Sequence, residues 1–237
     1  DFFFIQIGSC DGVKRDLIHG HILKYNWSGI LVEPVRYLFQ RLIKNYHGEK
    51  NLIFENIAVS REGGYRDFYY LRETNDPMPS WYDEIGSFFK DNVLKHEFAI
   101  PNIEKYIVSE KVKTITFTDL IRKYKVKKID LLHIDAEGYD YEILKLINFK
   151  DIKPGMILFE HRHLCDGDCK KSKSLLRENG YLFCKAGINI FAYQPFSFLE
   201  QLKVIFVILP VELIQRFVEK YRSKVSIQRN TSVYGEI

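Results

Sequence analysis

Short apolar runs of strand length alternate along this chain with segments whose apolar residues recur at helical spacing. Such alternation favours an open sheet of mostly parallel strands, because parallel neighbours are joined through a crossover helix. With helices on both faces, the predicted fold class is α/β and Rossmann-like. The expected strands are Phe2–Ile7, Gly29–Val32, Leu52–Phe54, Lys128–Ile134, Met156–Phe159, Tyr181–Cys184 and Ile188–Tyr193.

The last two expected strands differ from the others in their connection. Only Lys185-Ala186-Gly187 separates them, and a short link that contains glycine is typical of an antiparallel hairpin. We therefore expect a mostly parallel sheet that ends in an antiparallel C-terminal hairpin. This is a more specific architecture than a plain dinucleotide-binding half, which would add another crossover helix.

The chain is expected to form one main domain over residues 1–195. Residues 72–109 interrupt the alternation with three prolines and many aromatic side chains, and a connection this long predicts an insert or lid over an acceptor site. Residues 196–237 are expected to form a C-terminal helical extension whose apolar stripe begins with Leu199, Leu202 and Ile205. Packing on the sheet, or a homodimer formed through this helix, is favoured over membrane association.

Composition excludes several classes of protein. Of 237 residues, 46% are hydrophobic, which is enough for a sizeable core, and the formal net charge of +4 is small for a dedicated nucleic-acid binder. Four scattered cysteines predict no disulfide scaffold and favour a reducing, cytoplasmic location. No segment is long and apolar enough to predict a transmembrane helix. The chain starts inside an apparent strand, so we expect it to be a trimmed or excised stretch.

Ligands of open α/β sheets bind beyond the carboxyl ends of the strands, so the residues at those ends are the first candidates. The first strand is followed by Gly8-Ser9-Cys10-Asp11-Gly12, where two glycines allow a tight turn and a close backbone approach to a ligand. This spacing is not G-x-G-x-x-G, which counts against NAD. The second strand ends at Glu33-Pro34, roughly 20 residues further on, where an acid can accept hydrogen bonds from ribose hydroxyls. Asn56 and Ile57 follow the third strand and could flank an adenine ring.

The fourth strand runs into the richest group of acids, Asp135, Glu137, Asp140 and Glu142. The last two suit the first turn of the next helix, where carboxylates interact favourably with the helix dipole. Asp135 and Glu137 precede that helix, at the tip of the strand, so we expect them in the active site. They could also hold a divalent cation through oxygen ligands, although the sequence does not favour a metal.

The fifth strand is followed by a segment rich in histidine and cysteine. His161 at this tip is the expected general base, because imidazole titrates near neutral pH. A structural zinc ion held by His161, His163, Cys165 and Cys169 is a less favoured alternative, since the spacing matches no standard zinc pattern.

Three of these segments together resemble the FkbM family of S-adenosylmethionine-dependent methyltransferases. They are Phe4–Gly12, Gly29–Pro34 and Ile134–Gly138, and Thr116–Leu120 adds to the likeness, which extends over roughly Phe2 to Tyr193. The resemblance implies a seven-stranded class I methyltransferase sheet with an antiparallel final strand. It also implies O-methylation of a sugar or a natural-product hydroxyl, so the implied partner is a small-molecule or glycan acceptor.

The resemblance also implies roles for individual residues. Gly8 and its neighbours would face the methionine part of S-adenosylmethionine, Glu33 would hold the ribose, and Asn56 or Ile57 would border the adenine. Asp11, where many members carry an apolar residue, could bind the methionine ammonium group. The cofactor-binding residues expected are Gly8, Ser9, Asp11, Gly12, Glu33, Pro34, Asn56, Ile57 and Asp135, and the catalytic residues expected are His161, Asp135 and Glu137.

Two other functions compete with this interpretation. A methyltransferase-like fold that has lost turnover would act as a binding module, and the set Gly8, Glu33, Asp135 and Glu137 argues against that loss. An NAD-dependent oxidoreductase is disfavoured by the missing third glycine. Titration with S-adenosylmethionine and with NAD separates these hypotheses.

Overall fold

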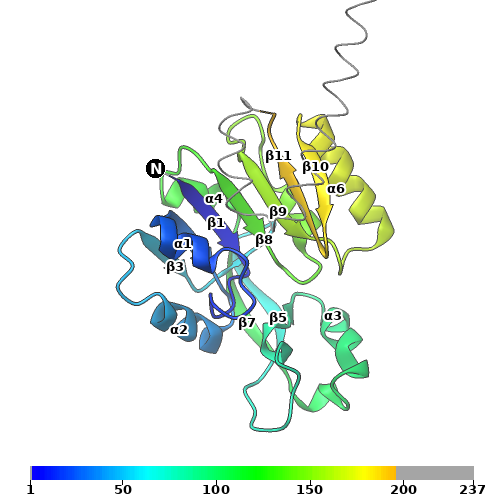
Figure 1. Ribbon diagram of the computed structural model, residues 1–237. Helices are drawn as coiled ribbons and strands as arrows, with labels where there is room; N and C mark the ends of the chain where they lie inside the picture. Colours follow the sequence, from blue (N-terminus) through cyan, green and yellow to red (C-terminus); the bar gives the residue numbers. More distant parts are fainter. Residues whose placement is uncertain (1, 196–237) are drawn as a thin grey trace, which may run out of the picture. The chain divides into compact units, whose positions relative to one another are not determined.

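The computed structural model describes residues 2–195, and its main sheet has seven strands in the order β10-β11-β9-β8-β1-β2-β3 (Figure 1). The strands are β1 (Phe3–Ile7), β2 (Ser28–Val32), β3 (Leu52–Glu55), β8 (Leu131–Ile134), β9 (Met156–Glu160), β10 (Leu182–Ala186) and β11 (Asn189–Tyr193). Strand β1 pairs in parallel with both β2 and β8, so the strand order reverses direction at β1. The predicted Rossmann-like α/β fold is confirmed, with a switch point between β1 and β8.

The C-terminal hairpin is also confirmed. Strand β11 is antiparallel to both of its neighbours, β9 and β10, whereas the other pairs of the sheet are parallel. Ala186 pairs with Asn189, which shortens the connection to Gly187 and Ile188. Gly187 has a φ of 62°, a left-handed conformation that glycine adopts without strain.

Helices pack on both faces of the sheet. They are α1 (His19–Tyr25), α2 (Arg36–Asn45), α4 (Phe117–Lys123), α5 (Asp140–Lys145) and α6 (Asp166–Glu178). On one face, Ile5 of β1 shares a core with α4, α5 and α6. Side chains alternate along a strand, so Phe4 points to the opposite face, where its ring lies 6.2 Å from that of Trp27 after α1. Tyr46 at the end of α2 contacts Phe54 of β3, with ring centroids 6.2 Å apart.

The long interruption of the alternation is larger and more regular than expected. It forms a second sheet in the order β4-β7-β5-β6, and we call residues 58–115 the insert. Its elements are β4 (Ala58–Val59), β5 (Gly64–Leu71), η1 (Tyr82–Glu84), β6 (Gly86–Ser87), α3 (Lys90–Leu94), η2 (Lys95–Phe98), η3 (Ile103–Lys105) and β7 (Ile107–Ile115). A separate small core that includes Leu71, Val93 and Ile103 stabilises it. The insert lies at the end of the main sheet toward which β1 and β8 point (Figure 1).

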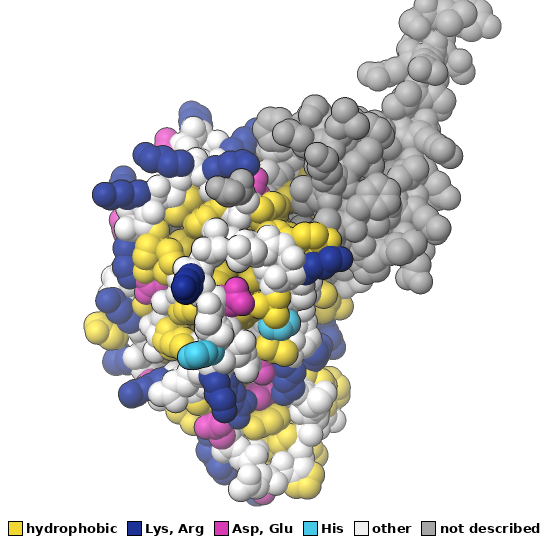
Figure 2. Space-filling view, turned by 60° about the vertical axis from the view of Figure 1, so that its left-hand side comes forward, with side chains coloured by type: hydrophobic (Ala, Val, Ile, Leu, Met, Phe, Trp, Pro, Cys, Tyr) yellow, Lys and Arg dark blue, Asp and Glu magenta, His cyan; other side chains and the backbone are white. Residues whose placement is uncertain are grey.

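Some expectations concern residues beyond 2–195. The predicted helical extension at 196–237, its apolar stripe from Leu199 and the homodimer through it lie outside the described residues. Within the described part, no helix is both long and apolar enough to cross a membrane. Lysine and arginine side chains are spread over the face seen in Figure 2 and do not gather into one basic stripe.

Candidate active site

A cavity with about 540 Å³ of open space lies at the carboxyl ends of the central strands. The main sheet and the insert both contribute walls. The polar or small lining residues are Gly8, Cys10, Glu33, Pro34, Glu84, Gly86, Asp135, Ala136 and Glu137, and the apolar ones include Ile57, Phe68, Phe88 and Tyr139.

Gly8 allows the loops after β1 and β8 to touch. Its φ is +81°, and a Cβ atom there would lie 1.8 Å from the carbonyl oxygen of Asp135. The amides of Gly8 and Ser9 both donate to the carbonyl of Val32, at 3.0 and 3.1 Å, which ties the same turn to the end of β2. Only glycine fits this position, because both the backbone conformation and the space exclude a side chain.

The other residues of the first loop make contacts within the loop and with the end of α2. A Cβ atom on Gly12 would lie 2.5 Å from the ring of Tyr46, so this glycine permits packing against α2. Asp11 Oδ1 accepts hydrogen bonds from the amides of Val13 and Lys14, at 2.9 and 2.8 Å, as in an Asx turn. Ser9 is buried, and neither it nor Asp11 nor Gly12 lines the cavity. These residues therefore take part in the turn, and the ligand contacts predicted for them stay predictions.

Glu33 is buried at the end of β2 and is held by two backbone amides. Its Oε2 accepts from Cys10 and its Oε1 from Val35, each at 2.8 Å. Burial raises the pKa of Glu33 to about 7, although the two amide hydrogen bonds oppose the shift. Cys10 donates from a strained left-handed conformation, with φ of 46°.

Asn56 supports this corner from outside the cavity. Its Nδ2 donates to the carbonyls of Glu33 and Pro34, at 2.8 and 3.0 Å, so the amide fixes the backbone after β2. The next residue, Ile57, does line the cavity. Two residues were expected to border an adenine ring. Ile57 lies at the cavity wall, whereas Asn56 stabilises the backbone behind it.

Glu137 is the second strained residue of the site, with φ of 47°. Its carbonyl accepts hydrogen bonds from Ser87 Oγ and Asn92 Nδ2 of the insert, at 3.1 and 3.0 Å. A Cβ atom on Gly138 would lie 2.5 Å from Asn92 Nδ2, so glycine leaves room for this contact. The insert is thereby attached to the loop that carries Asp135 and Glu137.

Carboxylates dominate the electrostatics of the cavity. Asp135 opens onto it, yet the surrounding protein excludes enough bulk water to raise its pKa, with added repulsion from Asp16. Burial raises the pKa of Glu84 to about 7, opposed by Arg15, whose guanidinium lies 3.1 Å away. Burial and the charge of Asp135 also raise the pKa of Glu137. A cavity with this surplus of acids favours a positively charged ligand.

His163, and not His161, reaches these acids. The His161 amide continues the strand ladder by donating to the carbonyl of Ile188, and its side chain does not line the cavity. The chain then turns, so that His163 Nε2 lies 3.2 Å from Glu137 Oε2. Burial, with His96 and Arg162 nearby, lowers the pKa of His163 to about 4, so its ring is neutral at pH 7. The structure thus places His163, rather than the predicted His161, beside these acids.

The zinc site suggested by the two histidines and two cysteines is not assembled. Cys165 is exposed and caps α6, where its Sγ accepts a hydrogen bond from the amide of Asp168. Among residues 2–195, the clusters of three ligand-type side chains contain no cysteine. They are formed by His96, Glu137 and His163, and by Asp135, Glu137 and Glu160.

Several residues of the site were not predicted from the sequence. Cys10 lies inside the loop already singled out, so its position was a usable signal. Glu84 and Phe88 come from the insert, where only the excess of aromatic residues pointed to a function. His96 also comes from the insert and meets the strand tips only through tertiary contacts that no spacing reveals.

Comparisons with known proteins agree with this architecture. A family model described as the methyltransferase FkbM domain matches residues 6–183. A search of curated proteins finds no match.

The solved structures that match the chain share little sequence with it. The fibrillarin pre-rRNA processing protein of Methanococcus jannaschii is 12% identical, with a TM-score of 0.40, over 81% of this chain and 65% of that one. The chain thus spans about two thirds of that protein's length. Precorrin-6y C5,15-methyltransferase of Geobacter metallireducens is 10% identical, with a TM-score of 0.42, over 82% of each chain. The N-terminal domain of human METTL16 in complex with SAH is 10% identical, with a TM-score of 0.42, over 83% of this chain and 62% of that one.

Proposed function

The chain belongs to the methyltransferase FkbM domain family, and from this premise we propose that it transfers a methyl group from S-adenosylmethionine to a hydroxyl of a sugar or natural-product acceptor. The observation that carries the proposal is the acid-lined cavity at the ends of β1, β2 and β8. S-adenosylmethionine carries a sulfonium and an ammonium group, so a cavity with surplus carboxylates complements its charge.

The residues present suit the parts of this cofactor. Glu33, pre-oriented by the amides of Cys10 and Val35, is proposed to accept hydrogen bonds from the ribose hydroxyls. Ile57 offers an apolar surface for the adenine ring at the same corner. Gly8 and Cys10 present the backbone of the first loop to the methionine part. When bound, S-adenosylmethionine supplies an electrophilic methyl group.

Asp135 is proposed to take the proton of the acceptor hydroxyl. It opens onto the cavity, and its raised pKa makes it a better base than an ordinary carboxylate. This assignment replaces His161 in that role, because His161 does not line the cavity. The insert is proposed to cover the acceptor and to exclude water through Phe68 and Phe88, which form part of the wall.

A small acceptor fits better than a nucleic acid. The insert forms part of the cavity wall, and on the one face drawn in Figure 2 the basic side chains of the described residues form no continuous stripe. Nucleic-acid binding depends mainly on such a stripe, because phosphate contacts supply most of the affinity.

Methyl transfer from labelled S-adenosylmethionine to a panel of sugars, macrocyclic alcohols and a structured RNA tests the proposal. We expect label on hydroxyls of the small acceptors. The Asp135→Asn variant should transfer at least about 100-fold more slowly while it still binds the cofactor. Label on the RNA alone would contradict the acceptor class. Cofactor binding without transfer to any acceptor would favour the inactive binding module.

A further inference from the structure

Beside the cavity, the insert and the main sheet bring together side chains of the type that bind transition metals. One ring nitrogen of His96, one of His163 and a carboxylate oxygen of Glu137 all lie within 4.8 Å of one another. His96 belongs to η2 of the insert, His163 follows β9, and Glu137 follows β8. Three separate elements therefore converge at one point, next to Glu160 at the end of β9.

The spacing around His163 fits a single ion, and a ring nitrogen of His96 lies within 4.8 Å of the ligand atoms of His163 and Glu137. His163 Nε2 lies 3.2 Å from Glu137 Oε2 and 3.7 Å from Glu160 Oε2. Two ligand atoms bound to a tetrahedral zinc ion at about 2.1 Å stand about 3.4 Å apart, so these atoms need little movement to share one.

Two buried polar atoms of the cluster have no hydrogen-bond partner. His96 is 8% exposed and Glu160 is 5% exposed, and within the described part of the chain His96 Nε2 and Glu160 Oε2 take part in no hydrogen bond. A buried polar atom without a partner costs free energy, and a bound cation would remove that cost. These two unpaired atoms are a second observation, separate from the grouping of ligand-type side chains, that points to a bound cation.

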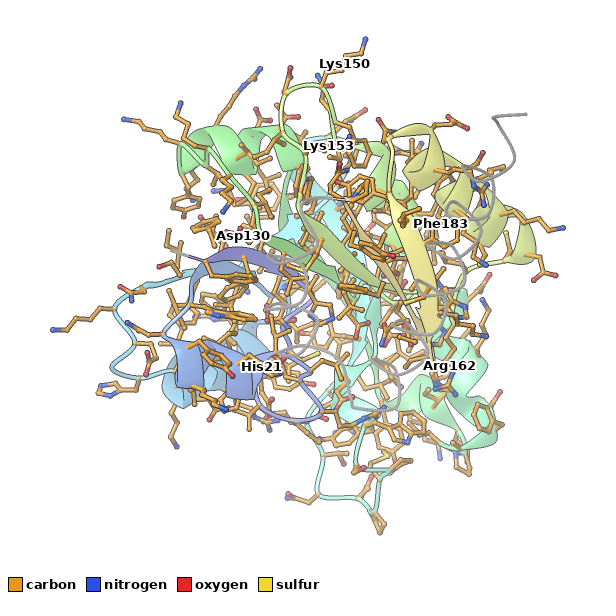
Figure 3. The ribbon with its side chains drawn as sticks, turned by 45° about the horizontal axis from the view of Figure 1, so that its top comes forward. His21, Asp130, Lys150, Lys153, Arg162 and Phe183 are labelled. Atoms are coloured by element: carbon orange, nitrogen blue, oxygen red, sulfur yellow. The ribbon has the colours of Figure 1, made fainter. Side chains whose placement is uncertain are left out.

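Charged side chains of both signs surround the cluster. The acids Glu137, Glu160 and Asp135 face it, and the cations near them are Arg162, Lys95 and Arg15. Figure 3 shows Arg162 at the end of the sheet beside the insert, opposite the end where Asp130 precedes β8.

We propose that His96, His163 and Glu137 bind one divalent transition-metal ion, with Glu160 as a neighbouring oxygen ligand, and that this ion fastens the insert to the tips of β8 and β9. Two imidazoles and a carboxylate are a ligand set found for zinc and for ferrous iron. Magnesium and calcium prefer oxygen ligands only, so they are expected to bind weakly here. Glu137 also lines the cavity, so the ion would lie at the edge of the acceptor site.

Metal binding to the purified chain tests the site without any methyl-transfer assay, so its outcome is independent of the proposed function. After exhaustive chelation, Zn²⁺ is titrated by calorimetry and Co²⁺ by its visible d–d absorption. We expect one ion per chain and a Co²⁺ spectrum typical of a four- or five-coordinate nitrogen and oxygen site. Mg²⁺ should not compete at a 100-fold excess.

Variants assign the ligands. His163→Gln and His96→Gln should each weaken Zn²⁺ binding more than about 100-fold, beyond the 10- to 100-fold typical of residues that only orient a ligand. His161→Gln, from the same loop, and His47→Gln, on an exposed turn after α2, are the matched controls and should retain the affinity. If one ligand variant unfolds, the other decides.

Three results would overturn the proposal. One is the absence of a stoichiometric Zn²⁺ or Co²⁺ ion. Another is binding that survives in both folded ligand variants or disappears in His161→Gln. The third is a preference for Mg²⁺ that is abolished by Glu160→Gln but not by His96→Gln, which would assign the ion to Asp135, Glu137 and Glu160.

Discussion

At the scale of single residues, substitutions of Gly8 and Gly48 distinguish the cost of backbone strain from the cost of a steric clash. Gly8 and Gly48 both have positive φ, 81° and 98°, but a Cβ atom on Gly48 would meet nothing within 4 Å. Gly48→Ala should therefore cost about 1 kcal/mol, from the left-handed conformation alone. Gly8→Ala should cost about 2 kcal/mol more, because its Cβ would overlap the Asp135 carbonyl. Urea unfolding of both variants measures the difference, and equal losses would contradict the close approach of the two loops.

Asp11 tests whether the first loop binds a ligand through this side chain. Its carboxylate accepts the amides of Val13 and Lys14 and is absent from the cavity wall. Asp11→Ala should therefore lower the free energy of unfolding by about 1 kcal/mol and leave the affinity for S-adenosylmethionine within about twofold of the original. A tenfold loss of affinity in a calorimetric titration would restore the ammonium-binding role that the sequence suggested.

Glu33 should make the free energy of unfolding depend on pH. Its pKa in the folded protein is about 7, above the value of 4.5 for a free glutamate, because burial disfavours the charged form. The folded state therefore binds the proton more tightly, and this stabilisation, present below pH 4.5, is lost as the pH rises through 7. From pH 5 to pH 8, the free energy of unfolding of the ligand-free protein should fall by up to about 3 kcal/mol more than that of the Glu33→Gln variant, whose residue 33 cannot ionise. Urea unfolding at both pH values measures this, and parallel pH profiles would contradict it.

At the residue scale, the sequence indicates positions best where the backbone alone decides them. Gly8, Glu33 and Asp135 line the cavity because they end parallel strands that meet at one edge. Asp11 and His161 do not line it, because the direction of a side chain depends on the turn that carries it, and their predicted roles stay predictions. The Asx turn and the strand ladder that engage these two residues cannot be read from their spacing.

At the scale of elements, the contact between α3 of the insert and the loop after β8 can be tested by itself. Asn92 of α3 donates to the carbonyl of Glu137 at 3.0 Å, and Leu at this position would keep the volume without the donor. Asn92→Leu should loosen the insert by about 1 to 2 kcal/mol, seen as about tenfold faster hydrogen exchange over residues 86–94 and 137–140. Asn148→Leu, which removes an exposed hydrogen bond to Asp151, is the control. Unchanged exchange in Asn92→Leu would show that other contacts hold the insert.

The elements of the main sheet could be predicted and those of the insert could not. Buried parallel strands such as β1 and β8 appear as short, mostly apolar runs, interrupted only by Gln6 and His133, respectively. Strand β5 pairs with β7 over eight residues, but its burial is irregular and its partner lies about 40 positions away in the sequence. The helix α6 begins at Asp166 with polar turns, so apolar spacing marks only its C-terminal part.

At the scale of the whole molecule, the strand order and the acidic cavity lead to the same proposal. The order reverses at β1, and the cavity lies at the strand ends beside this switch point. Glu33 and Asp135 come from strands on opposite sides of β1. The fold thus gathers carboxylates from both halves of the sheet around one site, which is the arrangement we propose for a cationic cofactor.

Calorimetric titration of S-adenosylmethionine into the purified protein, with NAD as the comparison ligand, tests this central claim most directly. We predict binding of one S-adenosylmethionine per chain and no binding of NAD. Glu33→Gln should bind at least about tenfold more weakly, since it loses charged hydrogen bonds, whereas the exposed Glu62→Gln should bind like the original protein. Binding of NAD in place of S-adenosylmethionine, or equal affinity in the folded Glu33→Gln variant, would contradict the assignment of this cavity.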